Sequence, residues 1–248
     1  MIVTKSADEL AIMREAGRIT AAALRAVGEA VAPGVTTAEL DRCAESLIRD
    51  AGAVPAFKGY HGFPGTLCTS VDGQVVHGIP GPRALREGEI VSVDCGAIVD
   101  GYYGDSAMTF AVGTVSDEAQ RLMAVTRASL EAGIARCRPG MRLHDISAAV
   151  QSIAEGAGFS VVREYVGHGI GREMHEDPQV PNYGRAGTGP TLKSGMVLAI
   201  EPMINSGGAA VRSLDDGWTV VTEDGSLSAH FEHTVAITED GPLILTLE

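Results

Sequence analysis

The chain has 248 residues, 45% of them hydrophobic and 21% charged, a composition typical of a globular protein with a full hydrophobic core. A net charge of −13, with scattered Lys and Arg residues, argues against direct nucleic-acid binding but leaves open a local basic contact with a large ribonucleoprotein. The four cysteines form no C-x-x-C pair, and there is neither a signal peptide nor an apolar run of 18 residues. We therefore expect a cytoplasmic protein that makes no membrane contact. We also expect a monomer, although none of these features bears on the oligomeric state.

The first clear element in chain order is an amphipathic helix that follows Pro33-Gly34. Thr36 and Glu39 have the spacing of a capping box, and Ala51-Gly52 marks the end of the helix. Apolar residues between them recur at the i, i+3, i+4, i+7, i+8 spacing that buries one helix face. These residues are Leu40, Cys43, Ala44, Leu47 and Ile48.

The next element is a β-hairpin that brings two carboxylates together. Residues 90–93 form an apolar strand that leads into Asp94, and Asp100-Gly101 is a strong signal for a type I′ turn. That turn places Gly96 opposite Asp105, so Asp94 and Asp105 become diagonal neighbours on one face. Two carboxylates ~4 Å apart repel by about 4 kcal/mol at an effective dielectric near ~20, which a bound cation would remove. Two solvated Asp residues on an exposed hairpin are the alternative, but the apolar run before Asp94 favours a buried strand.

The second half of the chain repeats the pattern of the first. Pro139-Gly140 lies 106 positions after Pro33-Gly34, and the following helix again ends at Ala-Gly, here Ala157-Gly158. Its apolar stripe is displaced by the same 106 positions and comprises Ile146, Ala149, Val150, Ile153 and Ala154. The apolar strand 197–200 then ends in Glu201, as strand 90–93 ends in Asp94.

This repeat predicts the fold class. We expect one α+β domain over residues 1–248, made of two pseudo-symmetric halves at about 1–115 and 116–248. The helices should cover one face of a curved, mostly antiparallel sheet, with the site in the cleft between the halves.

Three further residues have the character of metal ligands. Glu201 ends an apolar strand, where a carboxylate is costly unless it is paired or coordinated. Glu232 lies in the strand-like run 230–237, although an exposed strand face could place it in water. His168 lies between two glycines that permit close backbone approach, whereas a lone histidine is more often a packed or surface residue.

Together these residues predict a centre with two divalent ions. Four carboxylates and one neutral imidazole carry a charge of −4, which two divalent cations balance. Mostly oxygen ligands with one nitrogen favour Co, Mn, Fe or Zn in a catalytic role. Paired ions of this kind activate water and polarise a carbonyl for hydrolysis.

Three short strings extend this pattern to a known family. They are GYHGFP at 59–64, VHGIP at 76–80 and GHGIG at 167–171. Combined with the five candidate ligands at their spacing, they make the whole chain resemble type I methionine aminopeptidases in their short bacterial form. The resemblance implies a pita-bread fold, two bound metal ions and removal of the initiator methionine from nascent polypeptides whose second residue is small.

The resemblance also implies roles for individual residues. Asp105 and Glu232 would bridge the ions, Asp94 would complete one ion, and His168 and Glu201 the other. A metal-bridged hydroxide would attack the scissile carbonyl, with Glu201 as proton shuttle, His175 stabilising the oxyanion and His77 contacting the amide of the second residue. Substrate-binding residues would be Phe57, Tyr60, His61, Phe63, Cys68, His77, Met174, His175 and Trp218.

The chain departs from the family pattern at a few places, and rival functions stay open. Met174 stands where many members have Phe, and Phe57 where some have Cys, so the pocket width is open. Asp72-Gly73-Gln74 is expected to loosen the turn before His77. The rival functions are a proline-specific dipeptidase or aminopeptidase of the same fold, and a non-catalytic binding protein, a class that tends to lose ligands.

Overall fold

The computed structural model describes residues 2–248 and contains four long helices and a set of short and long strands. The helices are α1 Ala7–Ala30, α2 Thr37–Asp50, α3 Asp117–Ile134 and α4 Leu143–Gly156. The strands are β1 Val54–Pro55, β2 Leu67–Val71, β3 Gln74–Val76, β4 Ile90–Val99, β5 Tyr102–Ala111, β6 Ser160–Val161, β7 Gly167–Gly169, β8 Glu176–Val180, β9 Val197–Ile200, β10 Met203–Asn205, β11 Val211–Ser213, β12 Val220–Thr222, β13 Ser228–His230, β14 His233–Thr238 and β15 Gly241–Ile244, with a short 3-10 helix η1 at Tyr60–Gly62.

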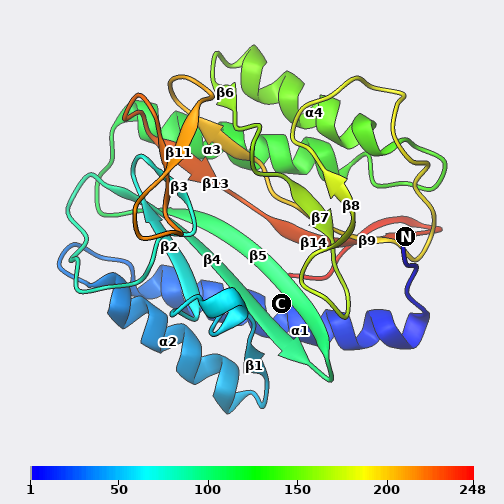
Figure 1. Cartoon of the computed structure of the whole chain (residues 1–248), viewed down its shortest axis with the longest axis horizontal. Helices are drawn as coiled ribbons and strands as arrows, with labels where there is room; N and C mark the ends of the chain where they lie inside the picture. Colours follow the sequence, from blue (N-terminus) through cyan, green and yellow to red (C-terminus); the bar gives the residue numbers. More distant parts are fainter. Residues whose placement is uncertain (1) are drawn as a thin grey trace.

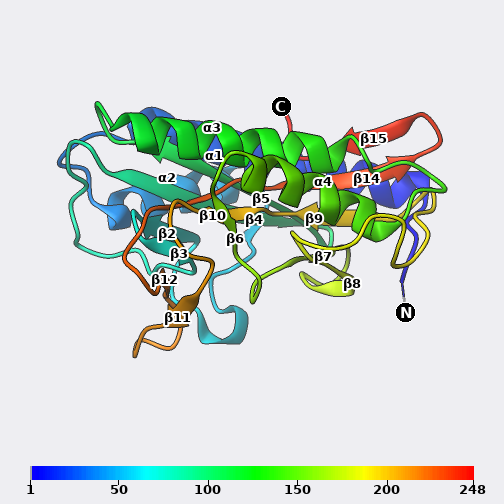
Figure 2. The same cartoon turned by 90° about the horizontal axis from the view of Figure 1, so that it is seen from above.

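The strands form a curved antiparallel layer across the middle of the molecule, with α1 and α2 in the lower part of the view and α3 and α4 in the upper part (Figure 1). In the turned view of Figure 2, α3 and α4 run along one side of the strands, while β8, β11 and β12 lie on the other side. Among residues 2–248, every strand pair is antiparallel. The predicted α+β fold with an antiparallel sheet is therefore confirmed. None of the helices in residues 2–248 has both the length and the apolar character needed to span a membrane.

The β4–β5 hairpin has the predicted register. Asp105 lies opposite Gly96, and the two turn residues have the positive φ of a type I′ turn, 47° at Asp100 and 77° at Gly101. Asp94 lies opposite Ala107, so Asp94 and Asp105 are diagonal neighbours. The strand before Asp94 is buried. The two carboxylates therefore belong to a buried strand pair and are not solvated residues of an exposed hairpin.

The two halves repeat one another in their hydrogen bonds. Helices α2 and α4 each have 14 residues, and each is preceded by a Gly that donates to the carbonyl of a later Leu. Gly34 N–H donates to Leu85 O at 2.7 Å, and Gly140 N–H donates to Leu192 O at 3.0 Å. These equivalences support the proposal of two related halves.

One residue of the predicted stripes does not face the core. Ile153 is 39% exposed, whereas the other branched apolar residues of the α4 stripe, Ile146 and Val150, are fully buried. Its position at i+7 therefore lies at the solvent-exposed edge of the apolar stripe. The prediction for Ile153 was therefore wrong.

The turn before His77 is tied down, contrary to expectation. The Asp72 carboxylate accepts from Ile90 N–H at 3.0 Å, and the Gln74 side-chain oxygen accepts from Val71 N–H at 2.8 Å. The Asp72 carbonyl also accepts from Ser228 N–H at 2.9 Å. Asp72 and Gln74 hold this turn with their own side chains.

The halves join where β5 runs beside the segment that links β13 to β14. Glu232 N–H donates to Ala107 O at 2.9 Å, and the Thr234 hydroxyl donates to Asp105 O at 2.7 Å. The Ser106 hydroxyl donates to Glu232 O at 2.6 Å. Hydrogen bonds to backbone carbonyls across this junction therefore fix Asp105 and Glu232 relative to each other.

Candidate metal centre

All the residues predicted for the site line one cavity of about 290 Å³. The five candidate ligands lie at one end, and the cavity wall is completed by Phe57, Tyr60, His61, Phe63, Cys68, His77, Met174, His175 and Trp218. The structure thus brings together fourteen residues spread over more than two thirds of the chain.

Each candidate ligand comes from a different strand or strand end. Asp94 lies on β4 and Asp105 on β5, while His168 lies on β7. Glu201 directly follows β9, and Glu232 lies between β13 and β14. Because both halves contribute, the cluster can form only when the two parts of the sheet have joined.

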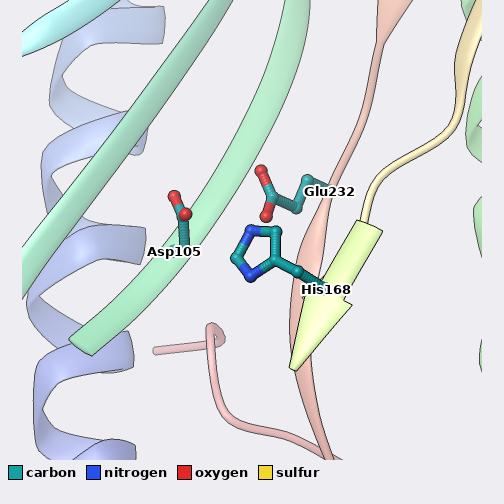
Figure 3. Close-up of side chains that lie close together, drawn as sticks. All are labelled: Asp105, His168 and Glu232. Atoms are coloured by element: carbon teal, nitrogen blue, oxygen red, sulfur yellow. The ribbon is translucent and has the colours of Figure 1, made fainter. Parts of the chain in front are cut away.

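Three of these side chains converge closely (Figure 3). Ligand atoms of Asp105, His168 and Glu232 all lie within 4.8 Å of one another, and all three residues are buried. Glu201 joins the group through its Oε1, which is 3.4 Å from His168 Nε2. His168 Nδ1–H donates to Gly169 O at 2.9 Å, so Nε2 carries the free lone pair and points to the carboxylates.

Several oxygen atoms in the cluster have no hydrogen-bond donor. Asp94 Oδ1, Asp105 Oδ1 and Glu232 Oε1 are buried and unpartnered. Buried acceptors are normally satisfied, so this concentration of free oxygens points to cations as their partners.

The pKa values follow from the same crowding. Burial, then the neighbouring carboxylates, raise the pKa of Asp94 and of Glu232 well above the usual range, and burial does the same for Glu201. Burial raises the pKa of Asp105 to about 7. Burial, helped by His175, lowers the pKa of His168 to about 4, so its imidazole is neutral at pH 7. The buried carboxylates need a positive charge nearby, and the neutral imidazole can donate a lone pair. Such a set of donors fits divalent metal ions.

The other end of the cavity is apolar. Phe57, Phe63, Cys68 and Met174 are all buried, and Phe63 packs edge-on against Trp218 with ring centroids 5.0 Å apart. Cys68 on β2 is the register partner of Asp94 on β4. The apolar pocket therefore begins directly beside the carboxylate cluster.

Histidines line the boundary between the two ends. His175 is exposed at the cavity rim, its Nδ1 is 2.9 Å from Tyr60 Oη, and its ring centroid is 4.4 Å from that of His168. His77 packs edge-on against Tyr165 and has a φ of 60°. A non-glycine residue in this left-handed region is strained, and such strain concentrates at functional sites. Burial lowers the pKa of His77 to about 4 and also lowers that of His175.

Sequence reasoning gave no role to His230, which lies behind the carboxylates. Its side chain is 2% exposed, and its Nε2 is 3.8 Å from Glu201 Oε2 and 4.0 Å from Glu232 Oε2 without a hydrogen-bond partner. Its spacing of two residues from Glu232, which places both on one side of an extended chain, was the signal that could have found it.

A curved antiparallel sheet that buries four carboxylates and a neutral histidine beside an apolar pocket defines a metal-dependent hydrolase. The chain belongs to metallopeptidase family M24, whose sequence profile matches residues 11–239.

Individual relatives indicate which kind of metallopeptidase the chain resembles. A methionine aminopeptidase of Clostridium perfringens is 55% identical over 247 residues, covering 100% of this chain and 99% of the relative. Methionine aminopeptidase 1 of Bacillus subtilis is 55% identical over 99% of both chains. The crystal structure of a methionine aminopeptidase from Thermotoga maritima is 48% identical and superposes with a TM-score of 0.99 over 100% of both chains.

More distant structures share the fold alone. A prolidase from Pyrococcus furiosus is 24% identical, with a TM-score of 0.79 over 99% of this chain and 66% of the prolidase. The expected pita-bread fold is confirmed by the methionine aminopeptidase structures.

Proposed function

We propose that this protein is a methionine aminopeptidase that removes the initiator methionine from nascent polypeptides with a small second residue. The observation that carries the proposal is the direct junction, in one cavity, of a five-ligand cluster and a buried apolar pocket. Full-length identity of 55% to methionine aminopeptidases supports it. A volume of about 290 Å³ lies at the small end of ligand pockets, which suits one terminal residue.

Asp94, Asp105, His168, Glu201 and Glu232 would hold the two metal ions. When bound, divalent ions supply a Lewis acid for the scissile carbonyl and lower the pKa of water. The donor set is compatible with Co, Mn, Fe or Zn, and cellular supply would decide among them. The four free cysteines agree with a reducing cytoplasm, where the partner is the N-terminus of a nascent chain, at the ribosome or after release.

The side chains of the cavity would divide the remaining tasks. The methionine side chain would lie among Phe57, Phe63, Cys68, Met174 and Trp218, which exclude water from the scissile bond.

Glu201 would move the proton from water to the leaving amine, because its carboxylate lines the cavity beside the other candidate ligands. Neutral His175 and His77 would act as hydrogen-bond donors to the substrate, His175 to the carbonyl oxygen and His77 to the second residue. His230 would orient Glu201 and Glu232 from behind.

The rival function, a proline-specific peptidase, shares the fold. Purified protein loaded with Mn²⁺ would be tested on three peptides, Met-Ala-Ser, Met-Lys-Ser and Ala-Pro. We expect rapid cleavage of Met-Ala-Ser, little cleavage of Met-Lys-Ser and none of Ala-Pro. Faster cleavage of Ala-Pro would replace the proposal with its rival, and no cleavage of any peptide in the presence of metal would remove both.

A further inference from the structure

A buried ion pair joins the N-terminal segment to the edge of the active-site cavity. Lys5 Nζ forms a short ion pair with Glu176 Oε2, and the two side chains are only 4% and 13% exposed. The Lys5 backbone is fixed as well, because its N–H donates to Gly195 O at 2.7 Å. Figures 1 and 2 show the segment before α1 on the side of the molecule that carries β8, where Glu176 begins the strand.

The second oxygen of Glu176 organises the loop before it. Glu176 Oε1 accepts from Arg172 N–H at 2.9 Å and from Glu173 N–H at 3.4 Å. Gly171 packs against this pair so closely that a β-carbon there would collide with Lys5 Cε and Glu176 Oε1. The Gly171 carbonyl accepts from Tyr103 N–H at 2.9 Å, which anchors the loop to β5.

This loop carries two residues of the cavity. Met174 is buried in the apolar pocket, and His175 at the rim contacts Tyr60. In the chain, both residues lie between Glu173, whose N–H donates to the Glu176 carboxylate, and Glu176 itself. A shift of Glu176 would therefore move Met174 and His175 first, whereas the four carboxylate ligands lie on other strands or strand ends.

We propose that Lys5 is a positioning residue of the active site, which acts through Glu176 on His175 and Met174. The inference rests on the proposed aminopeptidase function and names a residue outside the cavity on which that function depends. A simple stabilising role is a weaker explanation, because buried ion pairs often add little net stability. What the pair does supply is a second fixed end for this loop, because the Tyr103 hydrogen bond holds Gly171 at its start and the ion pair holds Glu176 at its end.

The test compares four proteins in the Mn²⁺-loaded form: wild type, Lys5→Met, His175→Ala and the double variant. Lys5→Met keeps most of the apolar stem and removes the charge. We expect it to lower kcat/KM on Met-Ala-Ser by about 10- to 100-fold, while the metal content stays unchanged. The displacement of His175 should lower kcat, and the displacement of Met174 should raise KM. If Lys5 acts through His175, the double variant should have the kcat of His175→Ala alone.

Hydrogen exchange of the Arg172 and Glu173 amides tests the proposal without measuring activity. Exchange should become faster in Lys5→Met, because Glu176 then holds these amides less firmly. Arg18→Met is the matched control, because it removes the exposed Arg18–Glu15 pair from α1. It should leave kinetics and loop exchange unchanged. If Lys5→Met does not fold, Glu176→Gln enters the same cycle, since it removes the negative charge and keeps an oxygen acceptor.

The outcomes are separable. Wild type that fails to cleave Met-Ala-Ser would contradict the proposed function, whereas exchange of the 171–176 loop would still report on the ion pair. Active wild type together with wild-type kinetics and loop exchange in a folded Lys5→Met protein would overturn the positioning role. Strictly additive effects in the double variant would overturn the route through His175.

Discussion

Metal removal should make the stability of this protein fall as the pH rises. In the folded, metal-free protein Asp105 has a pKa of about 7, whereas its ordinary value is 3.8. Between these values the folded state holds a proton that the unfolded state has released, so the free energy of unfolding decreases with rising pH. At ~1.4 kcal/mol per pH unit, Asp105 alone lowers the free energy of unfolding by about 3 kcal/mol between pH 5 and pH 8.

For a chain of this size, that loss corresponds to a melting temperature lower by roughly 6–12 °C. Thermal unfolding followed by circular dichroism, at pH 5 and pH 8 with a chelator, measures it directly. Added Mn²⁺ should raise the melting temperature much more at pH 8 than at pH 5, because only ionised carboxylates bind metal. Asp105→Asn should reduce the pH dependence of the chelated protein. A chelated wild type equally stable at both pH values would refute the buried, cation-dependent carboxylate cluster.

Three further predictions concern single residues. His175→Ala should lower kcat on Met-Ala-Ser by about 100-fold, with metal content by atomic absorption unchanged; lost metal would instead make His175 a ligand. Met174→Ala should raise KM for methionine peptides by about 10-fold, measured in steady-state kinetics, and an unaltered KM would place the methionine side chain elsewhere. Gly104→Ala should destabilise the fold by about 1–3 kcal/mol in urea unfolding, because its β-carbon would lie 2.6 Å from Gly17 N; an unchanged midpoint would contradict the close packing of α1 on β5.

The parts of the site that could be predicted from sequence are those fixed by local rules. The turn Asp100-Gly101 sets the hairpin register, and the period of two along each strand then places Asp94 beside Asp105. An apolar strand that ends in a carboxylate marks Glu201 in the same way. In each of these cases the information lies within about fifteen residues of the chain.

The parts that could not be predicted depend on contacts between distant segments. Lys5 and Glu176 are 171 positions apart, and nothing near either residue in the sequence announces a buried pair. The spacing of His230 and Glu232 places them on one side of the chain, but the approach of His230 to Glu201 depends on the distant strand end that carries Glu201. Ile153 fits the helical period, yet its side chain is exposed, because the period does not show how far the neighbouring elements extend over the helix.

The most direct test of the metal centre is anomalous diffraction from crystals of the protein loaded with Mn²⁺. Two peaks are expected in the cavity, enclosed by the side chains of Asp94, Asp105, His168, Glu201 and Glu232. Full Mn²⁺ occupancy elsewhere on the molecule, with no peak among these five residues, would contradict a two-metal site at the junction of the two halves.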